Sequence, residues 1–184
     1  HDALPIFLQA PFYSLHQSSS ANYGGIGAVI AHEISHAFDN NGAQFDKEGN
    51  LNKWWLDKDY EAFEEKQKEM IALFDGVETE AGPANGKLIV SENIADQGGI
   101  TAALTAAKDE KDVDLKAFFS QWAKIWRMKA SKEFQQMLLS MDVHAPAKLR
   151  ANIPPTNLEE FYETFDVKET DKMYRAPENR LKIW

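Results

Sequence analysis

The segment from Gly24 to Asp39 constrains the fold most, because it places two histidines within a helical pattern of apolar residues. The apolar residues recur at mostly three- and four-residue spacings, at Ile26, Val29, Ile30, Ile34 and Phe38. This spacing predicts a helix with a wide apolar face. We expect Asn22 to cap the start of the helix and Gly42 to stop it.

His32 and His36 are four residues apart in the run His32-Glu33-Ile34-Ser35-His36. On a helix they lie about 40° apart around the axis and about 6 Å apart along it. Both imidazoles can therefore reach one ion, and Glu33 can reach a water molecule beside that ion. Two histidines as zinc ligands with a glutamate as general base fit this pattern. The alternative is a chance match by two solvated histidines on an amphipathic helix.

A third protein ligand is needed to complete a catalytic zinc site with one open position. The zincin pattern with a third histidine fails, because Gly42 occupies that position. A downstream carboxylate is the other solution, and Glu92 and Asp96 share one face of an expected helix. Glu92 would bind the metal, and Asp96 would accept a hydrogen bond from a ligand histidine. Without the histidine motif, Glu92 and Asp96 would be interpreted as solvated acidic residues at the start of a helix, where carboxylates are favoured.

Two further features bear on the same site. Asp39 follows His36 by three residues and can reach its other ring nitrogen, although an acid at this end of a helix can equally be a cap or a surface residue. Gly98-Gly99 lies inside an expected helix, where glycine costs about 1 kcal/mol per residue. We expect this pair to permit close approach to another backbone.

The rest of the chain predicts a mainly helical single unit with a few short strands. Residues 1–22 read as a loop with at most one short strand, and residues 45–51 as a tight turn. Helices are expected at 57–74, 91–108, 115–126 (capped by Asp114) and 131–140. Lys87–Val90 is expected to be a short strand. Thr156 and Glu159 form a capping-box pattern for a last helix that ends at Phe165.

Composition excludes several classes of function. The chain has 184 residues with 29 acidic and 20 basic side chains, and its net charge of −9 argues against a nucleic-acid partner. It has no cysteine, which excludes disulfides, thiolate ligands and thiol nucleophiles. The longest apolar stretch, 24–31, is too short to span a bilayer, so we expect no membrane contact from this segment.

The absence of cysteine suits a reducing compartment, and we expect a cytoplasmic location. Because the sequence begins with His1 and not Met, we expect the natural N-terminus to be missing, which leaves a secreted or cell-surface location open.

Several motifs occur together in one order. They are Asn22-Tyr23-Gly24-Gly25-Ile26-Gly27, His32-Glu33-Ile34-Ser35-His36-Ala37-Phe38-Asp39, Glu92-Asn93-Ile94-Ala95-Asp96, Val143-His144-Ala145-Pro146, Arg150 and Trp184. Along essentially all 184 residues the chain resembles the neprilysin/endothelin-converting-enzyme family of zinc metallopeptidases, and within it the bacterial endopeptidase O branch. The resemblance implies a thermolysin-like zincin (gluzincin) fold. It also implies that residues 1–184 are the C-terminal part of a catalytic domain.

The resemblance assigns roles to individual residues. His32, His36 and Glu92 would hold one Zn²⁺, Glu33 would be the general base, and Asp39 and Asp96 would orient the histidines. His144 would stabilise the oxyanion, and Arg150 would hold the substrate backbone. An apolar pocket for the residue after the scissile bond would be lined by Phe12, Val29, Ile125 and Trp126.

The implied activity is the hydrolysis of oligopeptides on the amino side of hydrophobic residues, by water activated by zinc. The implied partners are a peptide substrate and the N-terminal lobe of the same enzyme, which this sequence lacks. The alternative is a zinc-binding fragment that is inactive without that lobe.

Overall fold

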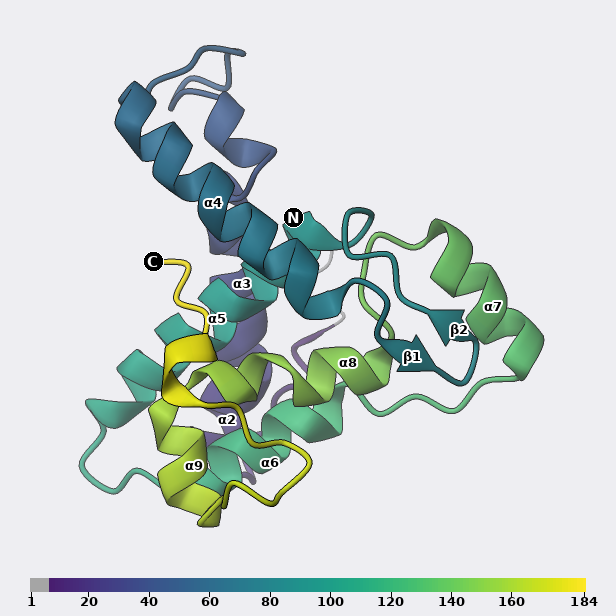
Figure 1. The fold of residues 1–184 in the computed structure, drawn as a ribbon. Coiled ribbons are helices and arrows are strands. Elements are labelled where there is room, and N and C mark those ends of the chain that lie inside the picture. The colour runs from purple at the N-terminus through teal and green to yellow at the C-terminus, as the bar shows by residue number, and fades with distance from the viewer. Residues whose placement is uncertain (1–6) are drawn as a thin grey trace.

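The computed structural model describes residues 7–184 and is mainly helical, as expected, with one two-stranded hairpin. Figure 1 shows α3 (Ala28–Ser35) and α5 (Val90–Lys108) side by side, with α4 (Asp57–Phe74) reaching away from them. None of the helices in this described part has both the length and the hydropathy needed to cross a membrane. The remaining helices are α2 (Ser19–Asn22), α6 (Leu115–Ile125), α7 (Lys132–Met141), α8 (Ala147–Asn152) and α9 (Glu159–Phe165).

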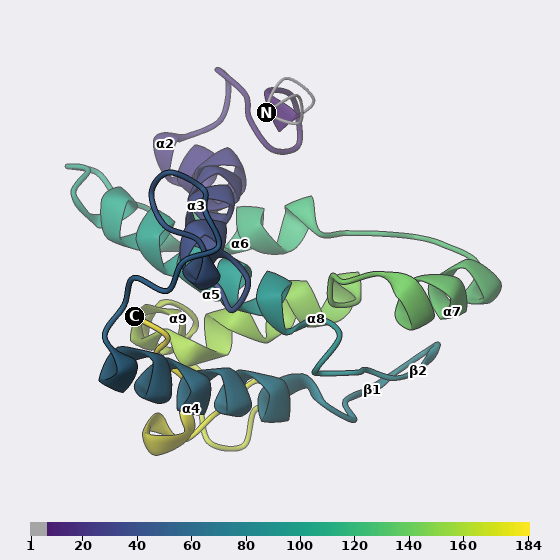
Figure 2. The ribbon, with the colours of Figure 1, turned by 90° about the horizontal axis from the view of Figure 1, so that it is seen from above.

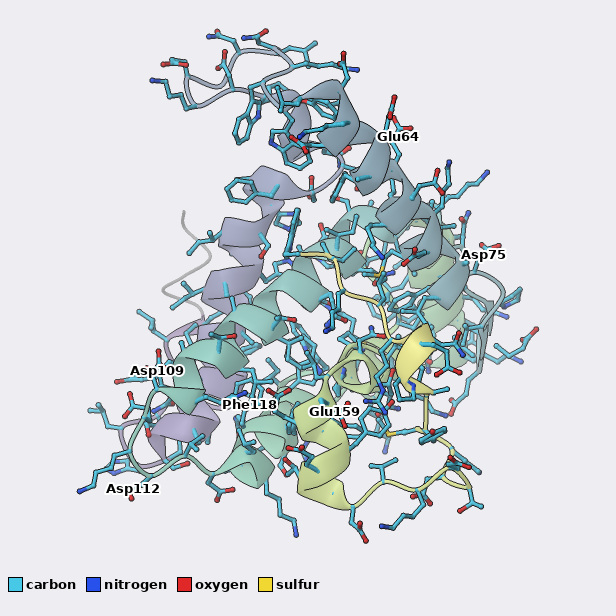
Figure 3. All side chains as sticks on the ribbon, turned by 60° about the vertical axis from the view of Figure 1, so that its left-hand side comes forward. Glu64, Asp75, Asp109, Asp112, Phe118 and Glu159 are labelled. Atoms are coloured by element: carbon cyan, nitrogen blue, oxygen red, sulfur yellow. The ribbon has the colours of Figure 1, made fainter. Side chains whose placement is uncertain are left out.

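Two large groups of buried apolar side chains hold these helices together. One joins α6 to α5 and α9 and centres on Phe118, which is fully buried and is labelled in Figure 3. The other lies beneath α4 and includes Phe63, Met70 and Phe74. Burying one such side chain contributes about 1.5–3 kcal/mol, so each group fixes the helices that it joins. Asp114 caps α6 as expected, because its Oδ1 accepts the backbone N–H of Ala117 at 2.9 Å.

The helical backbone around the histidines is longer and less regular than the sequence predicted. It runs from α2 through a π-helical turn at Tyr23–Gly27 into α3, and ends in a 3₁₀ turn at His36–Phe38. The Ser18 side chain caps its start, so the assignment of Asn22 as the cap was wrong. Asn22 instead forms two hydrogen bonds with the backbone of Ser14.

The expected apolar face of α3 is only partly buried. Ile26 and Val29 face the interior, whereas Ile30, Ile34 and Phe38 are 42%, 62% and 40% exposed. Periodicity correctly predicted the helix, but it could not distinguish a face that packs within this chain from a face that stays open.

α5 crosses α3 at the glycine pair, as the sequence predicted. A Cβ atom on Gly99 would lie 2.7 Å from the carbonyl oxygen of Ala28 and 2.9 Å from the backbone nitrogen of His32. A Cβ atom on Gly98 would lie 2.5 Å from Ser35 Oγ. Only residues without side chains let the two helices approach this closely, and this brings the start of α5 beside the histidines.

The hairpin and α7 project together from one side of the molecule (Figures 1 and 2). The hairpin pairs β1 (Glu78–Thr79) with β2 (Gly82–Pro83). The strand expected at Lys87–Val90 was wrong. Asn85 accepts the backbone N–H of Leu88 there, and the segment forms a turn that leads into α5.

Other local predictions had mixed outcomes. Phe45 and Leu51 form an antiparallel bridge around a turn, as expected. The capping box was wrong, because Thr156 lies in a 3₁₀ turn and donates its hydroxyl to the carbonyl of Ile153, so α9 starts after Leu158. No strand occurs in residues 7–22, and any strand in residues 1–6 lies outside the described residues.

Replacing Gly99 with alanine should destabilise the fold, because its Cβ would contact backbone atoms that cannot move aside. We expect Gly99→Ala to lower the free energy of unfolding by about 1–3 kcal/mol, measured by thermal or urea denaturation. Gly27→Ala is the matched control, because the nearest atom to its added Cβ is 3.4 Å away and belongs to a side chain. Equal stability of the two variants would contradict the role given to the crossing.

Candidate metal centre

The structure brings His32, His36 and Glu92 together at the crossing of α3 and α5. The two Nε2 atoms lie 3.1 Å apart, and Glu92 Oε2 lies 3.2 Å from that of His32 and 3.5 Å from that of His36. These ligand atoms all lie within 4.8 Å of one another and can share one ion. His32 lies in α3, His36 begins the 3₁₀ turn that follows it, and Glu92 lies in α5, more than fifty residues further along the chain.

Two carboxylates hold the other ring nitrogens of the histidines. Asp96 Oδ1 lies 2.9 Å from Nδ1 of His32, and Asp39 Oδ2 lies 2.7 Å from Nδ1 of His36. Because an ionised carboxylate only accepts hydrogen bonds, each Nδ1 carries the proton. Each Nε2 of a neutral ring therefore presents a lone pair, as a metal-binding imidazole must. The structure thus places Asp39 and Asp96 where the sequence suggested.

The two Nε2 atoms and Glu92 Oε2 point lone pairs at one another, an arrangement that a divalent cation between them would stabilise. Glu92 Oε2 is buried and has no hydrogen-bond partner among the described residues, although imidazole nitrogens surround it. Lone pairs that converge in this way repel one another unless a cation or a proton lies between them. Two imidazole nitrogens and one carboxylate oxygen are a ligand set that catalytic zinc uses.

The same crowding raises the proton affinity of the cluster when no metal is bound. The hydrogen bond to Asp39, followed by the nearby Glu92 carboxylate, raises the pKa of His36 from 6.5 to about 10. Burial alone would raise the pKa of Glu92, but the surrounding imidazoles of His144, His32 and His36, when protonated, hold this pKa far below its ordinary value. Metal binding must therefore displace protons from this site.

Arg150 forms an ion pair with Asp96, the carboxylate that holds His32. Its Nε and Nη2 donate to the two oxygens of Asp96, each at 2.7 Å, and its guanidinium stacks over the ring of Trp126 at 3.7 Å. A paired fork of this kind fixes the orientation of the carboxylate. Arg150 thus holds in place the group that orients His32. Its contact with a substrate stays a prediction.

His144 reaches the same cluster from the loop that precedes α8. Its Nε2 lies 3.1 Å from Glu92 Oε2, and its Nδ1 lies 2.8 Å from Asp142 Oδ1. Asp142 also accepts the backbone N–H of His144. The sequence analysis missed Asp142, although its position two residues before His144 was the available signal.

Ser91 is a second residue that the sequence analysis missed. Its hydroxyl donates to Asp39 Oδ2 at 2.5 Å, the same oxygen that holds His36. Asp39 Oδ1 accepts the backbone N–H groups of Asn41 and Gly42, each at 2.7 Å. Ser91 directly precedes Glu92 and therefore ties the start of α5 to the carboxylate that orients His36. No sequence pattern indicates such a contact across 52 residues.

Glu33 lies on the exposed side of α3, next to the histidines. It forms no hydrogen bond or ion pair with the other described residues, so its carboxylate is available to a water molecule or a ligand. Its role as a general base stays a prediction.

The four apolar residues expected around a pocket come together beside this centre. Val29 and Ile125 are buried with Ile26 in one cluster, and Phe12 and Trp126 pack against it with their rings 6.5 Å apart. The cluster therefore packs the start of α3 against the end of α6. Its use as a substrate pocket stays a prediction.

Removing the Ser91 hydroxyl should weaken metal retention. We expect Ser91→Ala to lower zinc affinity measurably, by less than the about 10- to 100-fold that is typical when a direct partner of a ligand, here Asp39, is lost. Competition with a chromophoric chelator measures the affinity, and circular dichroism checks the fold. Ser91→Thr keeps the hydroxyl and should retain zinc, and Ser140→Ala on α7 is a remote control. An unchanged affinity in Ser91→Ala would contradict the role of Ser91.

The metal-free chain should lose stability as pH rises from about 7 to 10. The pKa of His36 is raised on folding, so its contribution is full below 6.5 and disappears as pH rises through about 10. We expect the Tm of the chelated protein to fall across this range, more steeply than that of His36→Gln. His16→Gln should behave like the unchanged chain. Identical pH profiles for His36→Gln and the unchanged chain would contradict the linkage.

Comparison with known proteins places this geometry in a family. The model of Peptidase family M13 matches residues 4–181. The neutral endopeptidase of Lactococcus lactis subsp. lactis (strain IL1403) is 98% identical over 177 residues, which are 96% of this chain and 28% of that protein. Neprilysin-3 of Drosophila melanogaster is 34% identical over 96% of this chain and 24% of its own length.

Solved structures agree with the sequence comparisons. PepO from Lactobacillus rhamnosis HN001 matches 96% of this chain and 28% of its own, with 49% identity and a TM-score of 0.92. Zinc metalloprotease ZMP1 of Mycobacterium tuberculosis matches 96% of this chain and 30% of its own, with 36% identity and a TM-score of 0.91. The chain thus spans about 28% of the Lactococcus relative, and its zincin-like helical fold is that of these peptidases. The chain belongs to peptidase family M13.

Proposed function

We propose that this chain supplies the catalytic centre of a zinc-dependent endopeptidase that cleaves oligopeptides on the amino side of hydrophobic residues. The convergence of His32, His36 and Glu92, with both histidines held by carboxylates, supports this proposal most directly. The relatives named as neutral endopeptidases and as a zinc metalloprotease point the same way.

A bound zinc ion would polarise the scissile carbonyl and lower the pKa of a nearby water molecule to about 7. Glu33, exposed and unpaired in the described part of the chain, takes the proton of the attacking water and passes it to the leaving amine. His144 donates Nδ1–H to Asp142, and in its protonated form, which a raised pKa favours, it also donates from Nε2 toward the oxygen that becomes negative in the transition state. Asp39, Asp96 and Arg150 keep the histidines in the binding tautomer.

The apolar cluster of Phe12, Val29, Ile125 and Trp126 supports the preference for a hydrophobic residue after the scissile bond. These side chains lie between the histidine helix and the end of α6. Burial of a large apolar side chain against them contributes about 1.5–3 kcal/mol, enough to distinguish it from alanine.

A second candidate role is that of a metal-binding portion that turns over peptide only together with the rest of a longer protein. Ile30, Ile34 and Phe38, on the outer face of the histidine helix, are exposed to solvent. The chain also spans only about 28% of the Lactococcus relative. The remainder of such a longer protein could supply a lobe that covers this exposed apolar face.

Replacing Glu33 with glutamine separates metal binding from catalysis. We expect Glu33→Gln to lower kcat by about 10²- to 10⁴-fold, the contribution of a general base, while zinc content stays unchanged by elemental analysis. The assay uses the full-length Lactococcus relative with its matching region exchanged for this chain. Glu64→Gln, an exposed position on α4 that is labelled in Figure 3, is the control.

A fully active Glu33→Gln enzyme would remove Glu33 as the base. The same chelator-sensitive assay on the 184-residue chain alone separates the two candidate roles. Turnover by the chain alone supports an independent peptidase, and zinc binding without turnover supports the second role.

A further inference from the structure

A hollow of about 730 Å³ extends from the candidate centre toward the projecting arm of the molecule. His144 and Arg150 line it together with residues of the hairpin and of α7. Its volume lies in the range of sites that bind small molecules and peptides. The hollow lies beside the metal cluster and does not include it, since His32, His36 and Glu92 are not among the residues that line it.

The hollow adjoins the apolar cluster that is proposed to hold the residue after the scissile bond. Ile125 and Trp126 belong both to that cluster and to the wall of the hollow. If the cluster holds the residue after the scissile bond, as proposed above, the next residues of the peptide continue into the hollow. Leu138 and Leu139 of α7 add apolar surface along this path.

The charge of the hollow is opposite to that of the chain as a whole. Arg127, Lys129 and Lys148 line it, are exposed, and form no ion pair with any residue between 7 and 184. The other charged residues of the wall are Glu80, Asp142 and Arg150. Arg150 already pairs with Asp96, and Asp142 with His144, so the unpaired charge is three cations against one glutamate.

This positive wall occurs in a chain with a net charge of −9. The acidic residues labelled in Figure 3 lie outside the wall of the hollow: Glu64 and Asp75 at α4, Asp109 and Asp112 just after α5, and Glu159 at the start of α9. Cations gathered in a hollow of an acidic protein attract an anion there more strongly than scattered surface cations do. A guanidinium fork and two ammonium groups are suited to bind a carboxylate.

We propose that this hollow is a subsite for the part of a peptide that follows the scissile bond, and that Arg127, Lys129 and Lys148 select a carboxylate there. The carboxylate is either an acidic side chain or the C-terminal carboxylate of a short peptide. This inference rests on the proposed endopeptidase function and adds a substrate class to it: peptides with a large hydrophobic residue after the cleaved bond and negative charge beyond it.

The test compares peptides that differ only in charge, in the full-length Lactococcus context described above. One pair carries Glu or Gln two residues after the scissile bond, with an amidated C-terminus. A second pair carries Gln at that position and ends there in a free or an amidated carboxyl group. We expect kcat/KM to be higher for the charged member of at least one pair, and the pair that responds identifies the source of the carboxylate.

Removing the cations should abolish that difference. An exposed charge pair contributes about two- to fivefold, so Arg127→Gln/Lys129→Gln/Lys148→Gln should lower kcat/KM for the charged peptide about 10-fold and leave the neutral peptide unchanged. Added salt should reduce the preference of the unchanged enzyme. Lys58→Gln/Lys116→Gln/Lys132→Gln removes the same charge outside the hollow and should preserve the preference.

The outcomes distinguish this inference from the function beneath it. Cleavage of charged and neutral peptides at equal rates would overturn the carboxylate subsite and leave the endopeptidase intact. An equal loss with both triple variants would also overturn it, because the effect would then come from overall charge. Cleavage of none of the peptides by the zinc-loaded, folded enzyme would overturn the proposed function instead.

Discussion

The close crossing of α3 and α5 is the constraint on which the rest of the site depends. At Gly99 the two backbones leave no room for a Cβ atom, since one would lie within 3 Å of both Ala28 and His32. This contact sets the distance between the histidines on one helix and the carboxylates on the other. The ligand atoms, the orienting carboxylates and the arginine behind them all follow from it.

The polar groups around this crossing form a connected set that no single helix could supply. Asp96 joins His32 to Arg150, and Asp39 joins His36 to Ser91 and to two backbone N–H groups. Each carboxylate is buried, and each is stabilised by several donors, as a buried charge requires. The buried Glu92 Oε2 has no hydrogen-bond partner among residues 7–184, as expected of an oxygen that is placed to bind a metal ion.

Charge is distributed unevenly around this centre. Near the histidines it is mainly negative, and the acids there hold ring nitrogens or are available to bind a metal. Beyond Trp126 the exposed cations of the hollow make the local charge positive. A peptide whose hydrophobic residue is followed by a negative charge matches both the apolar cluster and this reversal.

The sequence by itself indicated most of the helices, the residues that meet at the candidate metal centre, and the family, because these depend on local spacing. Each of these features lies within a single helical segment, where the helical repeat alone sets the relative positions of the residues. They are the interval between His32 and His36, the Glu92–Asp96 pair and the glycine pair. Periodicity could not decide which face of α3 is covered, so Ile30, Ile34 and Phe38 were expected inside and lie exposed. The strand at 87–90 and the capping box at Thr156 failed because competing side-chain hydrogen bonds form turns there.

Only the tertiary structure decided the contacts that join distant segments. Ser91 meets Asp39, Arg150 meets Asp96, and Arg127 and Lys148 line one hollow because helices far apart in sequence pack together. Such contacts arise from packing, and packing depends on the shape of the whole chain. Local spacing in the sequence therefore identifies the residues of the site, whereas the packing of α3 against α5 sets the distances between them.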